Sequence, residues 1–540
     1  MRPWQWLPLS AALAIASAAC GPAAEAPGEK SAAENPAAEQ PQYGGVLNLA
    51  FSTEPSTLDL HEYNTSAPMF ASYNSLVRYD PLDPGMNKVE PSLADRWEIS
   101  PDGKTYTFHL VNGVKFHQSG DFTAGDVKFS YERQKNPAKG QVAPRKAAFD
   151  SVERIDVVDD HTVKVVMSQP YPSFLANIAQ GWMAMLDKEW VSAGHDPAKE
   201  VNGTGPFLWK NYIRGTVVEQ VKNPNYWKKG LPYLDGVKNF LIPDSGTLLA
   251  AFRTGSLHIT GTALTTAQQG ETTKILGDKV RFDRNPARWG GPVVFISTLK
   301  KPFNDVRVRR ALAYAIDREA GTKVLWEGQG FNQGYMPATG PWALPPEELA
   351  KFPGYGPDLE KNRAEAKRLL AEVGYPNGFD VVMHVRQQAG REQEAIFVQD
   401  QWKKIGVNAS LKIVETATTY EMLQKGDYEV FGFSVAVALA FDDPDAIFAE
   451  HFTCKAERNY PQLCISEVDA LFEKQTVELD LAKRKKLVND MEKAALNGMP
   501  RIMLPVGTNT VTGIWNILRN FTLQPNAYGN RHYEQVWLAK

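Results

Sequence analysis

The sequence predicts an α/β protein with an antiparallel section near residues 95–170. Alternating apolar residues stand between turn dipeptides in "SPDGKTYTFHLVNGVKF", a pattern typical of antiparallel strands, and "DVVDDHTVKVVM" indicates a second such pair. Apolar residues recur at helical spacing in "DVRVRRALAYAIDREAGTKVL" and "KNRAEAKRLLAEVGYPNG". Helices that alternate with short apolar strands favour layers of helix and sheet.

The two helical segments carry their own boundary signals. Asn304 or Asp305 is expected to cap the start of the first helix, and Gly374 to end the second. The arginines of Arg307–Arg310 are expected to meet carboxylates such as Asp305 and Asp317. We therefore interpret these charges as structural.

Length and charge limit the classes of protein that need to be considered. A chain of 540 residues, 43% hydrophobic and 22% charged, has ordinary globular composition and predicts roughly two to four domains. A net charge of -3 gives no electrostatic footprint for nucleic acid, so no nucleic-acid partner is expected. The basic run "KRKK" at Lys483–Lys486 is interpreted as the solvated face of a helix.

The N-terminus has the pattern of an export signal. An apolar stretch follows Arg2, and small residues precede Cys20, so residues 1–19 are predicted to be a signal peptide. Cleavage before Cys20 would leave a thiol that carries lipid, and a plain cleavage is the alternative. Residues 20–42 are rich in Ala, Pro and Glu without apolar periodicity, which predicts a flexible tether. We expect a periplasmic or extracytoplasmic protein anchored to the membrane by a lipid on Cys20.

Two further cysteines lie close together in the sequence. Cys454 and Cys464 are ten positions apart, and in an exported protein such a pair predicts one disulfide. A metal site is the alternative, but only His451 is nearby and no second thiol pair exists. No metal and no cofactor is expected.

Several long motifs, in order along the chain, resemble one family. They include "GGVLNLAFSTEPSTLDL", "SLADRWEISPDGKTYTFHLVNGVKF", "GTGPF", "NPNYW", "PFNDVRVRRALAYAIDRE" and "LLAEVGYPNGF", and the resemblance covers nearly all of residues 43–515. The chain resembles the solute-binding proteins of peptide-type ABC importers, family 5. The resemblance implies a periplasmic-binding-protein-like two-lobe fold of the large type II, with an extra α+β domain inserted in the first lobe.

Mapped on this sequence, the resemblance implies a discontinuous first lobe and hinges where the chain crosses between lobes. Ligand would be trapped by closure of the lobes. The expected parts are residues 43–75, 205–298 and 507–540 for the first lobe, residues 76–204 for the inserted domain, and residues 299–506 for the second lobe.

The resemblance also implies partners and a protein without catalytic activity. We expect a monomer that binds a peptide or small-molecule solute and delivers it to ABC permease subunits. A sensory protein that presents ligand to a membrane receptor would use the same cleft. A secreted hydrolase is the rival class, but G-x-S-x-G, H-E-x-x-H and two glycine-rich nucleotide motifs are absent. Asp442, Asp443 and Asp445 could be read as an acid pair or a Ca²⁺ loop, but the EF-hand pattern fails, because the sixth position is not Gly and the twelfth is not Glu. No catalytic residue is assigned.

The stretch "FGFSVAVALAFDDPDAIF" bears on the solute. In peptide-binding members, an aspartate shortly before an acid–Pro step pairs with the amino terminus of the peptide. Here the matching step is Asp443–Pro444, and four residues before Pro444 stands Ala440; counting from the other side gives Ala438. Asp442 is the alternative anion. If no anion is present, the ligand lacks a free amine there, as in a blocked peptide, an opine-like or sugar-like molecule, or an aromatic compound.

An apolar wall is expected around the ligand. The run Val435–Phe441 would provide it, unless these residues are buried core without ligand contact. Trp182 and Trp342 are possible ligand contacts, although most of the 13 tryptophans are expected to be packing residues. The predicted ligand-binding residues are Asn64, Trp289, Val435, Val437, Ala438, Ala440, Phe441 and Asp442.

Overall fold

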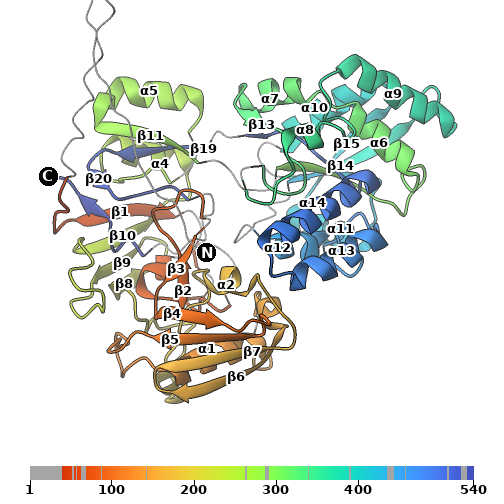
Figure 1. Cartoon of the computed structure of the whole chain (residues 1–540). Helices are drawn as coiled ribbons and strands as arrows, with labels where there is room; N and C mark the ends of the chain where they lie inside the picture. The colour runs from red at the N-terminus through yellow and green to blue at the C-terminus, as the bar shows by residue number, and fades with distance from the viewer. Residues whose placement is uncertain are drawn as a thin grey trace, which may run out of the picture. The chain divides into compact units, whose positions relative to one another are not determined.

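The computed structural model describes residues 39–540, apart from residues 52–53, 56, 63–67, 87, 142, 262–263, 286–290, 339, 388–390, 435–442, 457, 508–509 and 525–531. Helices and strands alternate along most of this chain, and the predicted α/β class is confirmed (Figure 1). None of the helices in these ranges is long and apolar enough to cross a membrane.

The N-terminal, middle and C-terminal parts of the chain are joined by strand pairing. The strands and helices concerned are β1 (Val46–Phe51), β8 (Phe207–Ile213), β9 (Val217–Lys222), β10 (Gly236–Leu241), α4 (Ser245–Arg253), α5 (Thr266–Leu276), β11 (Val280–Asn285), β19 (Thr510–Trp515), β20 (Leu518–Arg519) and β21 (Trp537–Leu538). One sheet has the order β1-β10-β9-β8, with β1 parallel to β10. Strand β11 pairs antiparallel with β19, which brings the C-terminal segment to this part of the molecule.

A separate antiparallel sheet forms where the sequence predicts one. Its order is β4-β5-β7-β6, and the turn after β4 has Gly103 at φ +67°, a conformation that glycine adopts without strain. Alternate residues of β5 are buried, as the period of two predicts. The elements of this region are η1 (Pro68–Ser72), β2 (Val77–Tyr79), β3 (Val89–Pro91), β4 (Ala94–Ile99), β5 (Thr105–Leu110), α1 (Ala124–Lys135), η2 (Lys146–Phe149), β6 (Val152–Asp159), β7 (Thr162–Met167), α2 (Phe174–Ile178) and α3 (Lys188–Ser192).

The third sheet has five strands and helices on both faces (Figure 1). Its order is β15-β14-β16-β12-β17, from β12 (Pro292–Ile296), β14 (Asp380–Arg386), β15 (Asn408–Val414), β16 (Val430–Ser434) and β17 (Arg501–Met503). All five residues of β12 are buried. Val293 and Phe295 belong to one core cluster and Val294 and Ile296 to the other, because successive residues of a strand face opposite sides.

Different helices supply the two cores. One core contains side chains of α6 (Val306–Tyr314), α9 (Leu359–Glu372) and α10 (Arg391–Lys403). The other contains side chains of α11 (Thr416–Lys425), α12 (Pro444–His451), α13 (Ser466–Val477) and α14 (Leu481–Gly498). The remaining elements here are α7 (Arg318–Trp326), β13 (Gly330–Phe331), α8 (Pro346–Leu349) and β18 (Val506–Gly507).

The arginines of α6 do not all meet carboxylates, which corrects the expectation. Arg307 pairs with Asp305, the N-cap of α6, at 2.7 Å. Arg309 instead donates to the carbonyl oxygen of Gly498 at 2.7 Å, and Arg310 donates to that of Asn497 at 2.8 Å. The last carbonyls of α14 have no partner within their helix, so guanidinium groups satisfy them.

The strand pairing also bears on where the chain crosses between the expected lobes. Strand β12 lies within residues 205–298 but pairs with β16 and β17, which belong to residues 299–506. The described strand pairings thus change from one set of sheets to the other between Asn285 and Pro292.

Candidate functional site

The predicted ligand-binding residues lie in segments outside the described residues. This holds for all eight: Asn64, Trp289, Val435, Val437, Ala438, Ala440, Phe441 and Asp442. Their flanking residues are described, and these show where each segment joins the fold.

Two of these segments, residues 286–290 and 435–442, join one edge of the five-stranded sheet. Strands β14 and β16 are parallel, so both present their carboxyl ends there, at Arg386 and Ser434. Strand β12 runs the other way, and its first residue, Pro292, pairs with Ser434. The chain that follows Ser434 and the chain that precedes Pro292 therefore meet the sheet side by side. The crevice outside the carboxyl ends of strands is where α/β sheets bind ligands.

An ion pair between the partly exposed Arg391 and the buried Glu394, which the sequence did not predict, lies at the start of α10. Arg391 Nη1 lies 2.7 Å from a carboxylate oxygen of Glu394. Burial raises the pKa of Glu394 to about 7, although Arg391 opposes the shift. A cavity of about 10 Å³ adjoins the pair and is also lined by Val293 and Gly432. This volume is enough for about one water molecule and not for a solute.

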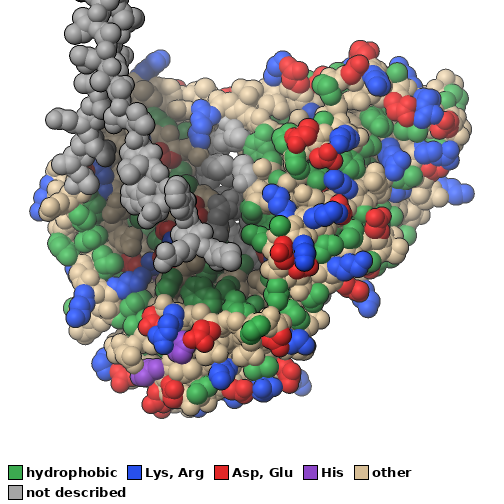
Figure 2. All heavy atoms as spheres, in the orientation of Figure 1, with side chains coloured by type: hydrophobic (Ala, Val, Ile, Leu, Met, Phe, Trp, Pro, Cys, Tyr) green, Lys and Arg blue, Asp and Glu red, His purple; other side chains and the backbone are tan. Residues whose placement is uncertain are grey.

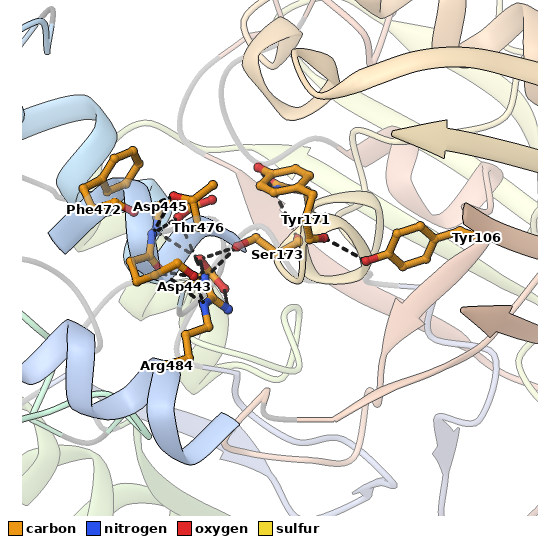
Figure 3. A network of polar contacts seen from close by, with 10 residues as sticks. Tyr106, Tyr171, Ser173, Asp443, Asp445, Phe472, Thr476 and Arg484 are labelled. Atoms are coloured by element: carbon orange, nitrogen blue, oxygen red, sulfur yellow. Dashed lines mark hydrogen bonds and ion pairs between the residues drawn. The ribbon is translucent and has the colours of Figure 1, made fainter. Parts of the chain in front are cut away.

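The acids at the end of the "DDPD" stretch belong to a buried network (Figure 3). Arg484 from α14 binds Asp443 through two hydrogen bonds, of 3.0 and 3.1 Å. The Ser173 hydroxyl donates to Asp443 Oδ1 at 2.9 Å and accepts from Arg484 Nη2 at 2.8 Å. Gln475 donates to Asp445 Oδ1 at 2.6 Å, and Asp443 caps α12 by accepting from the Asp445 backbone N–H.

This network gives the acids a structural role. Asp443 and Asp445 are buried, and both lie near the guanidinium of Arg484. Burial, and then the charge of Asp443, raise the pKa of Asp445 to about 6. These side chains satisfy one another's hydrogen bonds and charges, which explains why carboxylates follow directly after an apolar run. Asp442 lies outside the described residues.

The interpretation of "KRKK" as a solvated face is wrong at one position. Lys483, Lys485 and Lys486 are exposed, but Arg484 is only 4% exposed. The signal that identifies Arg484 is its spacing from Val488 and Met491, which are buried on the same side of α14. On the face of the molecule shown in Figure 2, basic and acidic side chains are interspersed, as a net charge of -3 predicts.

Trp182 and Trp342, which the sequence offered as possible ligand contacts, both belong to hydrophobic cores. Trp182 is 1% exposed and makes an edge contact with Phe70, with ring centroids 5.9 Å apart. Trp342 is buried, and the guanidinium of Arg484 lies 4.8 Å from its ring centroid.

The sulfur atoms of Cys454 and Cys464 lie 1.93 Å apart, a distance that fits the predicted disulfide. Asp469 lies beside them and accepts a hydrogen bond from the Cys454 backbone N–H at 2.9 Å. Within the part of the chain that the structure describes, these three residues are the group that could hold a metal ion. Because the sulfurs are bonded to each other, they offer no thiolate ligand.

The fold and the position of the candidate site define a class, the two-lobed solute-binding proteins, and comparison with known proteins defines the family. The sequence model of the bacterial extracellular solute-binding proteins, family 5 Middle, matches residues 88–459. The chain belongs to this family, so it is a solute-binding protein of the ABC-importer type and not an enzyme.

Named relatives agree with this assignment. The dipeptide-binding protein of Escherichia coli K12 is 27% identical over 499 residues, covering 86% of this chain and 88% of the relative. The ABC transporter-associated periplasmic binding protein DppA of Helicobacter pylori, solved with the peptide STSA, is 25% identical with a TM-score of 0.74, over 92% of this chain and 99% of that chain. AgaA of A. tumefaciens R10, solved with agropinic acid, is 26% identical with a TM-score of 0.71, over 92% and 99%. These matches confirm the predicted two-lobe fold.

Proposed function

We propose that the chain captures its solute by closing two lobes and then presents it to the permease subunits of an ABC importer. The observation that carries this proposal is the meeting of Ser434 and Pro292 at the carboxyl edge of the five-stranded sheet. Seven of the eight predicted ligand residues, all except Asn64, lie in the segments next to these two positions, as a binding crevice at that edge requires.

The strand pairings support the expected lobes, with one change to the boundary. The first lobe comprises residues 43–75, 205–285 and 507–540, the inserted domain residues 76–204, and the second lobe residues 291–506. The chain then crosses between lobes once between β11 and β12 and again between β18 and β19. Two such crossings serve as hinges for closure.

The solute is a peptide-like or non-peptide small molecule that places no free amine against Ala440. Relatives have been named or solved with a dipeptide, with the peptide STSA and with agropinic acid, so this scaffold accepts more than one class of ligand. The apolar run Val435–Phe441 suits a ligand with an apolar body.

A thermal-shift panel tests this ligand class. The probes are leucyl-leucine, N-acetyl-leucyl-leucine, agropinic acid, maltose and 4-hydroxybenzoate, each with the full chain. A probe at 100 times its Kd stabilises the folded protein by about 2.7 kcal/mol, which raises the melting temperature. We expect the N-acetylated dipeptide or a non-peptide probe to raise it more than leucyl-leucine does. A larger rise with leucyl-leucine contradicts the proposed class.

The protein is a monomer held at the membrane through a lipid on Cys20. The small residues before this cysteine and the family assignment support the anchor. Cys20→Ser is expected to move the protein from the detergent phase to the aqueous phase in a Triton X-114 partition. Ser17→Ala keeps the thiol and is the matched control. Equal partition of the two variants would rule out the anchor.

A further inference from the structure

Ser173 joins two parts of the chain that are distant in sequence. It precedes α2 in the proposed inserted domain, whereas its partners Asp443 and Arg484 lie at the starts of α12 and α14 in the proposed second lobe. Ser173 is fully buried, and Asp443 and Arg484 are 3% and 4% exposed. The contact is thus shielded from water.

The chemistry of this contact makes Ser173 a bridge. Its hydroxyl donates to a carboxylate and accepts from a guanidinium, and both of these groups are charged. Charge-assisted hydrogen bonds of this kind are about twice as strong as neutral ones. The Asp443–Arg484 pair has two hydrogen bonds of its own, so it persists when Ser173 leaves.

The inserted domain holds Ser173 in position. Tyr106 on β5 donates to the Tyr171 carbonyl oxygen at 2.8 Å (Figure 3). The Asn177 side chain donates to the Ser173 carbonyl oxygen at 3.1 Å. Gly103, in the turn between β4 and β5, also lies close to Leu479, which precedes α14. A Cβ atom built on Gly103 would be only 2.8 Å from a Leu479 methyl group. The turn between β4 and β5 and the turn before α2 therefore meet the same part of the second lobe.

We propose that Ser173 is a closure clasp, whose hydroxyl docks on the Asp443–Arg484 pair when the lobes close and stabilises the closed arrangement even without solute. This inference rests on the proposed closure of the lobes. Asp443 directly follows residues 435–442, so the clasp acts beside the predicted ligand segment. A contact made only in the closed state favours every ligand that binds that state.

The test compares Ser173→Ala with Ser168→Ala in the ligand-free full chain. Ser168 belongs to the same domain but is exposed, and its hydroxyl donates to the Ser151 carbonyl oxygen. Loss of hydrogen bonds to charged groups predicts about tenfold faster deuterium exchange at the start of α12 in Ser173→Ala, with no change in Ser168→Ala. Because Ser173→Ala leaves the ion pair intact, the variant is expected to fold, and circular dichroism checks this.

Small-angle scattering then separates a clasp from a permanent interface. A clasp predicts a larger radius of gyration for Ser173→Ala than for the parent protein and for Ser168→Ala. An unchanged radius, or unchanged exchange at the start of α12, overturns the clasp. Neither measurement uses a solute, so failure of the clasp is distinguishable from failure of the proposed solute class.

Discussion

Ala440 is the residue on which the proposed ligand class depends. In the peptide-binding members that this chain resembles, an aspartate at the matching position pairs with the ligand's amino terminus. A buried ammonium group without such a partner costs several kcal/mol. We expect Ala440→Asp to gain affinity for leucyl-leucine, measured by calorimetry, and not for its N-acetylated form.

Ala438→Asp is the matched control for this substitution. It places the same charge two residues earlier, at the position that the alternative register favours. If only Ala438→Asp gains affinity for leucyl-leucine, the alternative register, with the anchor position at residue 438, is the correct one. A gain in neither variant, together with tight binding of leucyl-leucine by the parent protein, would contradict the missing-anchor hypothesis.

Glu492 is expected to make the free energy of unfolding depend on pH. Its carboxylate is fully buried in α14 and accepts from the backbone N–H groups of Tyr335 and Met336. Burial raises its pKa from 4.5 to about 7. The folded state therefore holds the proton more tightly than the unfolded state, so this contribution is greatest below pH 4.5 and is lost as the pH rises through 7.

Glu492→Gln is expected to remove this loss. Between pH 4 and pH 8, the free energy of unfolding of the parent protein should fall by about 3 kcal/mol relative to that of the variant, since each pKa unit corresponds to about 1.4 kcal/mol. Melting temperatures across this range provide the measurement, and the exposed Glu473→Gln is the control. Parallel pH profiles for the parent protein and Glu492→Gln would refute the assignment.

Single residues also show what the sequence could not establish. The N-cap Asp305 was predictable because capping depends on local sequence. The roles of Arg484 and Ser173 were not, since their partners come from other segments of the chain and no periodic pattern records such a contact. Arg484 had a partial signal in helical spacing, whereas Ser173 had none.

At the scale of elements, a side chain of α6 stabilises the C-terminal end of α14. Arg309 donates to the carbonyl oxygens of Gly498, Met499 and Phe303, and it is 3% exposed. An ammonium group lacks the fork geometry that reaches all three oxygens. Arg309→Lys should therefore lower the stability by about 2 kcal/mol, measured as a lower melting temperature.

Arg307→Lys is the control on the same helix. Arg307 is an exposed partner of Asp305, and exposed pairs contribute about 0–1 kcal/mol. Equal effects of the two substitutions would show that Arg309 does not hold the end of α14.

Element type was predictable more often than element partner. The hairpin between β4 and β5 and the helices α6 and α9 follow from alternation, spacing and turn residues. The partner sheet of β12 does not, because "PVVFI" is apolar throughout and fits any buried strand. The expected boundary at residue 298 and the observed change of sheet before Pro292 differ for this reason.

At the scale of the whole molecule, the long collinear motifs predicted the fold better than they predicted the site. These motifs contain turn, cap and core positions such as Gly103, Asp305 and Val308. The residues predicted to bind the solute lie in segments outside the described residues, so those assignments stay predictions.

Scattering with and without solute tests the central claim of capture by closure most directly. The ligand is the probe that raises the melting temperature most in the thermal-shift panel. Closure about the two crossings predicts a smaller radius of gyration when this probe is bound. An identical radius in the presence and absence of a stabilising probe would contradict closure as the mechanism of capture.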